Sequence, residues 1–191
     1  IEFKYTFDYW DVDRLAVLND SYYITMFFYP FVPVYDEDGW NIEPFSFAGE
    51  SYFNTIGDYY VTLNVPEDYQ VATSGKLTNS KITKNRLELH YEILDARDFS
   101  FSAYDQYNVY EREVDSRMYS IYSIDELSAS LQNQYFDYMT TTFDVMEEGV
   151  GAYYYDHFTL ELGYIYGMES TGVVYCDMNV QEATIVHEII H

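Results

Sequence analysis

The hydrophobic residues of this chain repeat with two different periods, and the period changes near the middle of the sequence. Over the first hundred residues, apolar and polar side chains alternate, which is typical of half-buried β-strands. Beyond the segment from Tyr104 to Tyr110, apolar residues recur every three or four positions, which is typical of amphipathic helices. The two periods in this order predict an α+β fold, with an antiparallel β-rich first part and a boundary within this segment.

The first part contains clear strand patterns and turn signals. Residues 59–65 alternate between apolar and polar side chains and are followed by Pro66, and residues 87–93 alternate in the same way. The sequence Asp-Glu-Asp-Gly at 36–39 is typical of a hairpin turn, and Ser-Gly at 74–75 indicates a second turn. Strands joined by short turns favour an antiparallel sheet.

The second part predicts a long helix followed by a short strand. The helix is expected over residues 124–148, because its apolar residues recur at helical spacing. Ser123 has the spacing of a capping box with the glutamate three residues later, and Gly149 fits a C-terminal stop. The strand is expected over residues 158–162.

The charge of the chain excludes two classes of function. Asp and Glu total 33 against 9 Lys and Arg, which gives a formal net charge of −24. Binding to nucleic acid or to an anionic membrane surface needs clustered cations, so neither is expected. The acidic residues are scattered, which favours a solvated surface.

No apolar run is long enough to predict a membrane span. The single cysteine, Cys176, permits no internal disulfide and is interpreted as a small core residue.

A last helix is expected from near Val180, capped by Asn179, and it carries His187-Glu188-Ile-Ile-His191. Residues four apart share one helix face, so both imidazoles can point a nitrogen at one zinc ion. Glu188 can take a proton from a water at the ion and pass it to a leaving amine. The alternative is two histidines spaced by chance on an apolar helix. Three fixed positions seldom coincide by chance, so we predict a zinc site.

A second segment, Gly167-Met168-Glu169 followed by Ser-Thr-Gly, precedes this helix. It is similar to a Gly-x-Met-Glu-Asn segment whose bacterial variant reads Gly-Met-Glu-Tyr-Pro-Gly. With the histidine motif, it resembles the aminopeptidase-N-like family of zinc metallopeptidases, which are gluzincins with a thermolysin-like catalytic domain. Weaker likeness to the same family lies in the β part, at 29–35 with 39–40, then at 59–66, 72–75 and 96–99.

The resemblance implies a role for each matching residue. His187 and His191 would be zinc ligands, and Glu188 would be the general base. Glu169 would bind the free α-amino group of a peptide substrate, because a carboxylate is the natural partner of an ammonium group. The residues implied to line the cleft along an edge strand are Gly167 and Met168.

The resemblance also implies which part of the enzyme the chain would represent. Residues 1–105 would be the second part of a saddle-like β domain, and residues 106–191 would be the first part of a thermolysin-like α/β domain. The family's third zinc ligand, a Glu on the next helix, and its transition-state-stabilising Tyr are expected beyond His191. Ser170 and Thr171 depart from the family pattern. We therefore expect an internal, inactive fragment of a zinc metallo-aminopeptidase, with a lean towards an extracytoplasmic or membrane-associated parent protein.

Two other functions are left open. The first is a non-catalytic binding module with a vestigial or structural metal site, in which the tyrosine-rich sheet contacts a protein or glycan. The second is a related zinc endopeptidase, against which Glu169 argues. The two remaining histidines are given structural interpretations, His90 as a cross-strand partner and His157 as a loop or surface residue.

Overall fold

The computed structural model describes residues 1–6, 14–42 and 53–191, and these contain fourteen strands and two helices. The strands of the N-terminal part are β1 (Leu15–Leu18), β2 (Tyr22–Thr25), β3 (Tyr35–Asp36), β4 (Gly39–Trp40), β5 (Gly57–Pro66), β6 (Gln70–Thr73), β7 (Lys76–Thr83), β8 (Arg86–Ala96) and β9 (Phe101–Tyr104). The elements of the C-terminal part are β10 (Asn108–Val114), β11 (Arg117–Ser123), α1 (Ala129–Gly149), β12 (His157–Gly163), β13 (Gly167–Ser170), β14 (Val173–Asp177) and α2 (Glu182–Ile190). This mostly antiparallel β structure with two helices agrees with the predicted α+β class.

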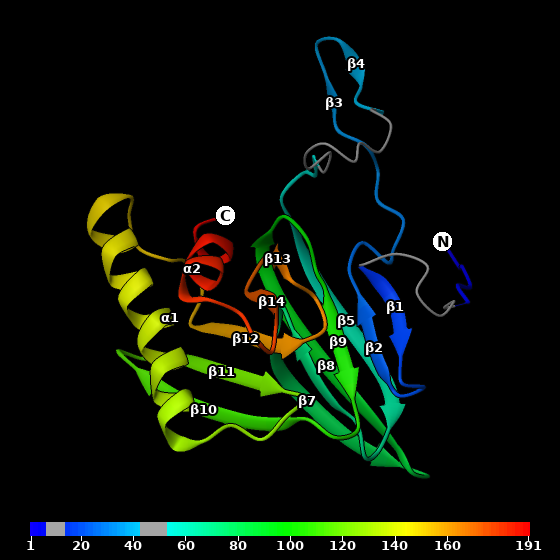
Figure 1. Ribbon diagram of the computed structural model, residues 1–191. Helices are drawn as coiled ribbons and strands as arrows, with labels where there is room; N and C mark the ends of the chain where they lie inside the picture. The colour runs from blue at the N-terminus through cyan, green and yellow to red at the C-terminus, as the bar shows by residue number, and fades with distance from the viewer. Residues whose placement is uncertain (7–13, 43–52) are drawn as a thin grey trace.

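The N-terminal strands form antiparallel sheets. One sheet has the order β1-β2-β9-β6 and another has the order β5-β8-β7. The predicted strands at 59–65 and 87–93 lie in β5 and β8, which pair with each other. The predicted turn at 36–39 joins β3 to β4, whose hairpin projects from the body of the protein (Figure 1). The antiparallel structure predicted for the first part is therefore confirmed.

The C-terminal strands form a single mixed sheet with the order β10-β11-β12-β14-β13. The two central pairings, β11 with β12 and β12 with β14, are parallel, whereas the two outer pairings are antiparallel. The strand predicted at 158–162 is confirmed as β12. Within the described part of the chain, β13 is an edge strand, and it carries the Gly-Met-Glu segment.

Both faces of this mixed sheet are buried at its centre, and β12 shows how. Phe158, Leu160 and Leu162 point into a core that also contains residues of α1. Glu161 points to the opposite face, where it contacts Tyr22 of β2. Figure 1 shows α1 on one side of the sheet and the N-terminal sheets on the other. A sheet covered on both faces buries both alternating sets of side chains.

Helix α1 begins at Ala129 rather than at residue 124, so its predicted start is wrong. The hydroxyl of Ser123 donates to the backbone carbonyl of Asp125 at 2.7 Å and closes a local turn instead of capping a helix. The N-cap is Ser128, whose hydroxyl accepts from the backbone N–H of Leu131 at 3.3 Å. The helix ends at Gly149, as predicted.

Helix α2 begins at Glu182, and the predicted cap at Asn179 is also wrong. The N–H of Asn179 donates to Oδ1 of Asp177 at 2.6 Å, so a turn set by that aspartate precedes the helix. The N-cap is Gln181, whose side chain makes no capping hydrogen bond. Ile185 is fully buried and anchors α2 on the core.

The N-terminal and C-terminal parts share one hydrophobic cluster. Tyr22 and Ile24 of the first part pack with Met168, Val173 and Tyr175 of the second. Because this cluster spans both parts, the predicted division between residues 105 and 106 stays a prediction.

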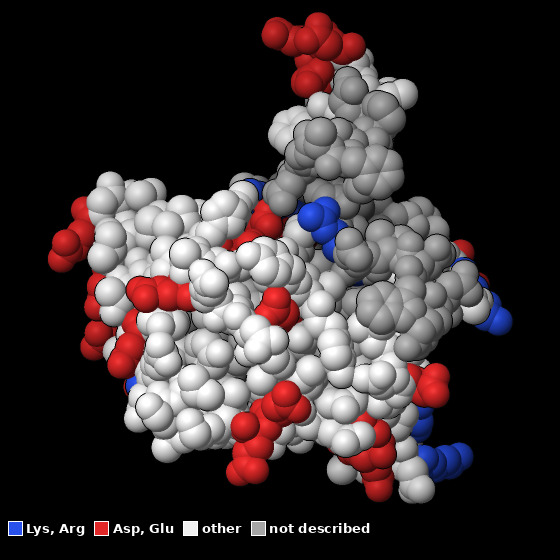
Figure 2. All heavy atoms as spheres, in the orientation of Figure 1, with Lys and Arg blue, Asp and Glu red and all other residues white. Residues whose placement is uncertain are grey.

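The surface carries acidic side chains over many elements. Figure 2 shows them spread across the face in view, with an acidic group at the projecting hairpin. This distribution is that of the solvated acidic surface expected from the sequence. Neither described helix is both long and apolar enough to cross a membrane.

Candidate metal centre

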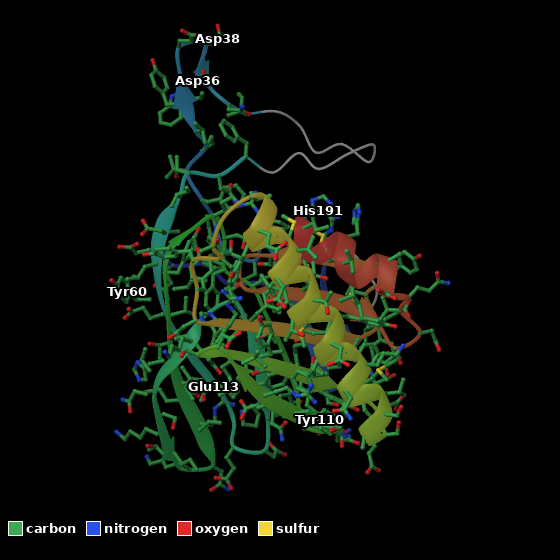
Figure 3. All side chains as sticks on the ribbon, turned by 90° about the vertical axis from the view of Figure 1, so that its left-hand side faces the viewer. Asp36, Asp38, Tyr60, Tyr110, Glu113 and His191 are labelled. Atoms are coloured by element: carbon green, nitrogen blue, oxygen red, sulfur yellow. The ribbon has the colours of Figure 1, made fainter. Side chains whose placement is uncertain are left out.

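The C-terminal end of α2 brings the two histidines of the motif together. Nε2 of His187 and Nε2 of His191 lie 2.9 Å apart, and their ring centroids are separated by 4.6 Å. His191 follows the last residue of α2, and its N–H donates to the carbonyl of His187 at 3.3 Å. Figure 3 shows His191 at this end of the helix, where 37% of its side chain is exposed. The two imidazole nitrogens therefore converge at a point that solvent can reach.

The geometry of this pair fits two ligands of one zinc ion. Tetrahedral zinc with Zn–N distances of about 2.0–2.1 Å holds two ligand nitrogens about 3.3 Å apart. The observed 2.9 Å between Nε2 of His187 and Nε2 of His191 differs from this by a few tenths of an ångström, which small side-chain rotations can supply. Residues 1–6, 14–42 and 53–191 contain no group of three or more His, Cys, Asp or Glu side chains that could hold one ion. The described residues thus bring two imidazole nitrogens to a spacing that one zinc ion could bridge.

Glu188 lies against the edge strand β13. The residue is 8% exposed. A Cβ built on Gly167 would lie 2.4 Å from Oε1 of Glu188 and 3.1 Å from Cγ2 of Thr184. The carboxylate therefore occupies the space that a side chain at position 167 would fill, and the glycine permits helix and strand to approach this closely.

Replacing Gly167 with alanine should displace the Glu188 carboxylate and lower the free energy of unfolding by about 1 kcal/mol, the low end of overpacking costs, because the group that must move is the end of a flexible side chain. The measurement is urea denaturation at neutral pH. Gly57→Ala in β5 is the matched control, because a Cβ there meets nothing within 4 Å. The control should change stability by no more than about 0.5 kcal/mol. Equal stability of the two variants would contradict the close approach of Glu188.

Glu169 projects from β13 towards the same end of α2. Its Oε1 lies 3.5 Å from Nδ1 of His191, and 16% of its side chain is exposed. A carboxylate beside Nδ1 favours the tautomer that carries a proton on that nitrogen. The Nε2 lone pair of His191 is then free to face an ion. Glu169 is thus well placed both to orient a histidine and to meet a cationic ligand.

Met168 points the opposite way from Glu169, because neighbouring residues on a strand face opposite sides. It is 2% exposed and packs with Tyr22 and Tyr175. It also borders a hollow of about 120 Å³ together with Glu169 and His191. Its role in lining a substrate cleft stays a prediction.

A larger cleft of about 440 Å³ lies beside His191. It is bordered by the C-terminal end of α1, the segment 151–155 and the C-terminal end of α2. Glu169 and Glu188 both contribute to its wall. The cleft offers room for a ligand next to the paired imidazoles.

Sequence reasoning missed the N-terminal residues that hold β13 in place. Oδ1 of Asp98 accepts from the hydroxyl of Ser170 at 2.7 Å and from the N–H of Thr171 at 2.8 Å. A guanidinium N–H of Arg97 donates to the backbone carbonyl of His191 at 3.4 Å. No local sequence signal reports such contacts, because the partners lie more than seventy residues apart.

A buried carboxyl group, Glu161 on β12, was also missed. The hydroxyls of Tyr22 and Tyr107 donate to its Oε1 at 2.9 and 2.7 Å, and its Oε2 has no hydrogen-bond partner. Complete burial raises the pKa of Glu161 to about 8, although the two tyrosine hydrogen bonds act in the opposite direction. The signal available in the sequence was a charged residue inside an otherwise apolar strand.

The remaining histidines and the cysteine have structural roles. His90 lies opposite Thr62, with Nδ1 3.3 Å from the threonine hydroxyl, so its interpretation as a cross-strand partner is confirmed. The surface interpretation of His157 is wrong, because its side chain is 15% exposed and its Nε2 lies 2.8 Å from the carbonyl oxygen of Ser74. Cys176 is fully buried, and burial raises the pKa of its thiol, which confirms a core residue.

No protein-family model and no curated protein matches this sequence. Solved structures do match its fold. A two-domain M1 zinc metallopeptidase variant bound to L-arginine aligns with a TM-score of 0.57 at 12% identity, over 69% of this chain and 33% of that chain. An M1 zinc metallopeptidase from Deinococcus radiodurans aligns with a TM-score of 0.56 at 13% identity, over the same shares.

The chain thus spans about a third of the length of these structures. Identities of 12% and 13% support a common fold and leave the activity to be tested. The comparison shows that about two-thirds of this chain has the fold of a part of the M1 zinc metallopeptidases.

Proposed function

We propose that this chain is part of a zinc-dependent aminopeptidase and contributes two zinc ligands, a general base and an anchor for the substrate amine. The observation that carries the proposal is the convergence of the His187 and His191 nitrogens, 2.9 Å apart, beside buried Glu188. A third protein ligand would come from outside the described residues, and the catalytic domain would be thermolysin-like.

Each residue would act on a different part of the reaction. Zinc, when bound, would polarise the scissile carbonyl and make a nearby water more acidic. Glu188, held beside β13, would accept a proton from the attacking water and deliver it to the leaving amine. The outer edge of β13, which is an edge strand among the described residues, would pair with the substrate backbone and direct the peptide past the histidines.

Glu169 would limit the reaction to the first residue of a peptide. Its carboxylate would accept hydrogen bonds from the α-ammonium group, and it lies 3.5 Å from His191. A fixed distance between an amine anchor and the ion leaves room for one residue between them. The preferred substrate would therefore be a peptide with a free N-terminus.

Zinc binding tests the metal part of the proposal directly. The wild-type chain should compete for zinc with a chromophoric chelator, and His187→Ala or His191→Ala should weaken this binding by at least about tenfold. The double variant should bind no more weakly than either single variant, because one histidine alone makes a poor site. His90→Ala is the matched control, since His90 of β8 pairs with Thr62 of β5 and should leave zinc affinity unchanged. Equal affinity in all variants would rule out this site.

The endopeptidase alternative makes a different prediction for Glu169. In the parent protein, Glu169→Ala should lower kcat/KM for an aminoacyl reporter by about 10²-fold or more, because the variant loses the ammonium partner. An endopeptidase would cleave an internally quenched, N-acetylated peptide equally well with glutamate or with alanine at position 169. The ratio of the two activities, measured in wild type and variant, distinguishes the two functions.

A non-catalytic binding module is the second candidate. Its histidine pair would be a vestigial or structural metal site, and its tyrosine-rich sheet, on which Tyr60 is 69% exposed, would contact a protein or glycan. In this case the parent protein would cleave neither reporter, and Glu188→Gln would bind its partner as the wild type does.

A further inference from the structure

The edge strand β13 has one face towards α2 and one face towards the N-terminal part. Gly167 and Glu169 face α2, where they contact Glu188 and His191. Ser170 faces the N-terminal part, as Met168 does. Contacts that fix the second face therefore fix the backbone from which Glu169 projects.

Asp98 makes two of these contacts and lies in the connection between β8 and β9. Its Oδ1 accepts from the hydroxyl of Ser170 at 2.7 Å and from the N–H of Thr171 at 2.8 Å. Hydrogen bonds to a carboxylate are stronger than those between neutral groups. One side chain thus holds the two residues that follow Glu169.

Two serines and a glycine complete the attachment. The hydroxyl of Ser100 donates to that of Ser170 at 2.7 Å, and it lies 2.9 Å from the hydroxyl of Tyr175. A Cβ on Gly172 would lie 2.6 Å from the carbonyl oxygen of Ser74, and the φ angle of Gly172 is +78°. The turn between β13 and β14 is therefore pressed against the N-terminal part, and only a glycine fits at this position.

Asp98 also borders the space next to His191. Asp98, Glu169 and His191 all line the hollow of about 120 Å³, which Arg97 also borders. A small shift of the turn would move the Glu169 carboxylate relative to His191. A misplacement of about 1 Å in a positioned group can reduce a reaction rate by about 10²-fold.

We propose that Asp98 is a positioning residue, which fixes Glu169 at the distance from the metal site that selects ligands with a free α-amine. This inference rests on the proposed function. It assigns to the N-terminal β part a direct role in the selectivity of a site built on α2 and β13. It also explains Ser170, where the family pattern has Asn or Tyr, as a hydroxyl that both accepts from Ser100 and donates to Asp98.

The attachment itself is tested by amide hydrogen exchange of Thr171, measured by NMR on the whole chain. Asp98→Ala should raise the exchange rate of this amide by about tenfold or more, because its acceptor is lost. Asp98→Asn keeps an Oδ1 acceptor and should change the rate much less. If Asp98→Ala fails to fold, Ser170→Ala provides the second variant, with a smaller rise expected. Unchanged protection of Thr171 in a folded Asp98→Ala protein would overturn the inference, whatever the protein's function.

The selectivity is tested with zinc-loaded protein and two probes, L-leucine hydroxamate and its N-acetyl derivative. The wild type should bind the free amine more tightly, and Asp98→Ala should reduce this preference by about tenfold, the usual scale for residues that orient a ligand group. Asp98→Asn should retain the preference, and zinc affinity should stay the same in all three. Asp144→Ala is the control, because Asp144 is exposed on α1 and borders neither the cleft nor the hollow beside His191.

The outcomes separate this inference from the function on which it rests. If the wild type shows no preference for the free amine, the amine-anchoring function fails and the inference fails with it. A second outcome is that the wild type shows the preference, that Glu169→Gln abolishes it and that Asp98→Ala retains it. In that case the function stands and the role of Asp98 is overturned. Loss of the preference in both Glu169→Gln and Asp98→Ala supports both.

Discussion

Replacing Glu161 with glutamine should raise the free energy of unfolding near pH 8 and leave it almost unchanged near pH 5. Glu161 is completely buried between Tyr22 and Tyr107, and its pKa is raised from 4.5 to about 8, chiefly by burial. Glutamine has the same shape and keeps an acceptor for both tyrosine hydroxyls. It cannot ionise, so it avoids the cost of a buried charge.

The sign of the effect follows from proton binding. Between about pH 4.5 and pH 8 the folded protein keeps the Glu161 proton while the unfolded chain has released it. The folded state binds more protons in this range, so the free energy of unfolding falls as pH rises. At 1.36 kcal/mol for each pKa unit, the loss approaches about 5 kcal/mol by pH 8 and levels off above it. Tyr22, Tyr107 and Tyr175 stay neutral throughout, because burial raises the pKa of each well above its usual value.

The measurement is urea denaturation of wild type and Glu161→Gln at several pH values between about 5 and 9. The difference between the two proteins isolates Glu161 from all other titrating groups. Glu126→Gln is the control, because Glu126 is exposed and precedes α1. Its profile should run parallel to that of the wild type. A Glu161→Gln profile that is also parallel would show that the carboxyl group does not retain its proton in the fold.

Features that repeat locally could be predicted from the sequence. Strands β5 and β8 were found because their side chains alternate in burial, and the hairpin at 36–39 because its turn residues are specific. The end of α1 at Gly149 was found for the same reason. The histidine pair was predictable because helical spacing alone brings the two rings together.

The start of each helix could not be predicted, because several residues competed for the same role. Ser123 and Ser128 both suit an N-cap, and the choice depends on where β11 ends and what the Ser123 hydroxyl contacts. Asn179 likewise lies in a turn formed by Asp177. Capping residues are also turn residues, so the pattern alone does not separate them.

The supports of the candidate site were unpredictable for a different reason. Asp98 and Ser170 are 72 residues apart, and Tyr22 and Glu161 are 139 apart. These contacts exist only because the N-terminal sheets lie against the mixed sheet, which no local pattern specifies. The candidate site residues could therefore be proposed from the sequence, whereas the residues that hold them in position could not.

The largest effect on activity is expected from Glu188→Gln in the parent protein that we propose contains this chain. The variant should lower kcat for an aminoacyl reporter by about 10²–10⁴-fold, the usual contribution of a general base. Glutamine has the shape of glutamate, so it should keep the close contact with Gly167 and leave the fold intact. It has no carboxylate to accept a proton from the attacking water.

Zinc affinity provides the second measurement on the same variant. It should stay within a few-fold of the wild type, because the ligands that we propose are the nitrogens of His187 and His191 and not the Glu188 carboxylate. Glu182→Gln is the matched control, since Glu182 is exposed in the first turn of the same helix and should alter neither quantity. Loss of zinc together with activity would make Glu188 a ligand rather than a base. Full activity of Glu188→Gln would require a different base, and the approach of β13 to α2 at Gly167 would then serve packing alone.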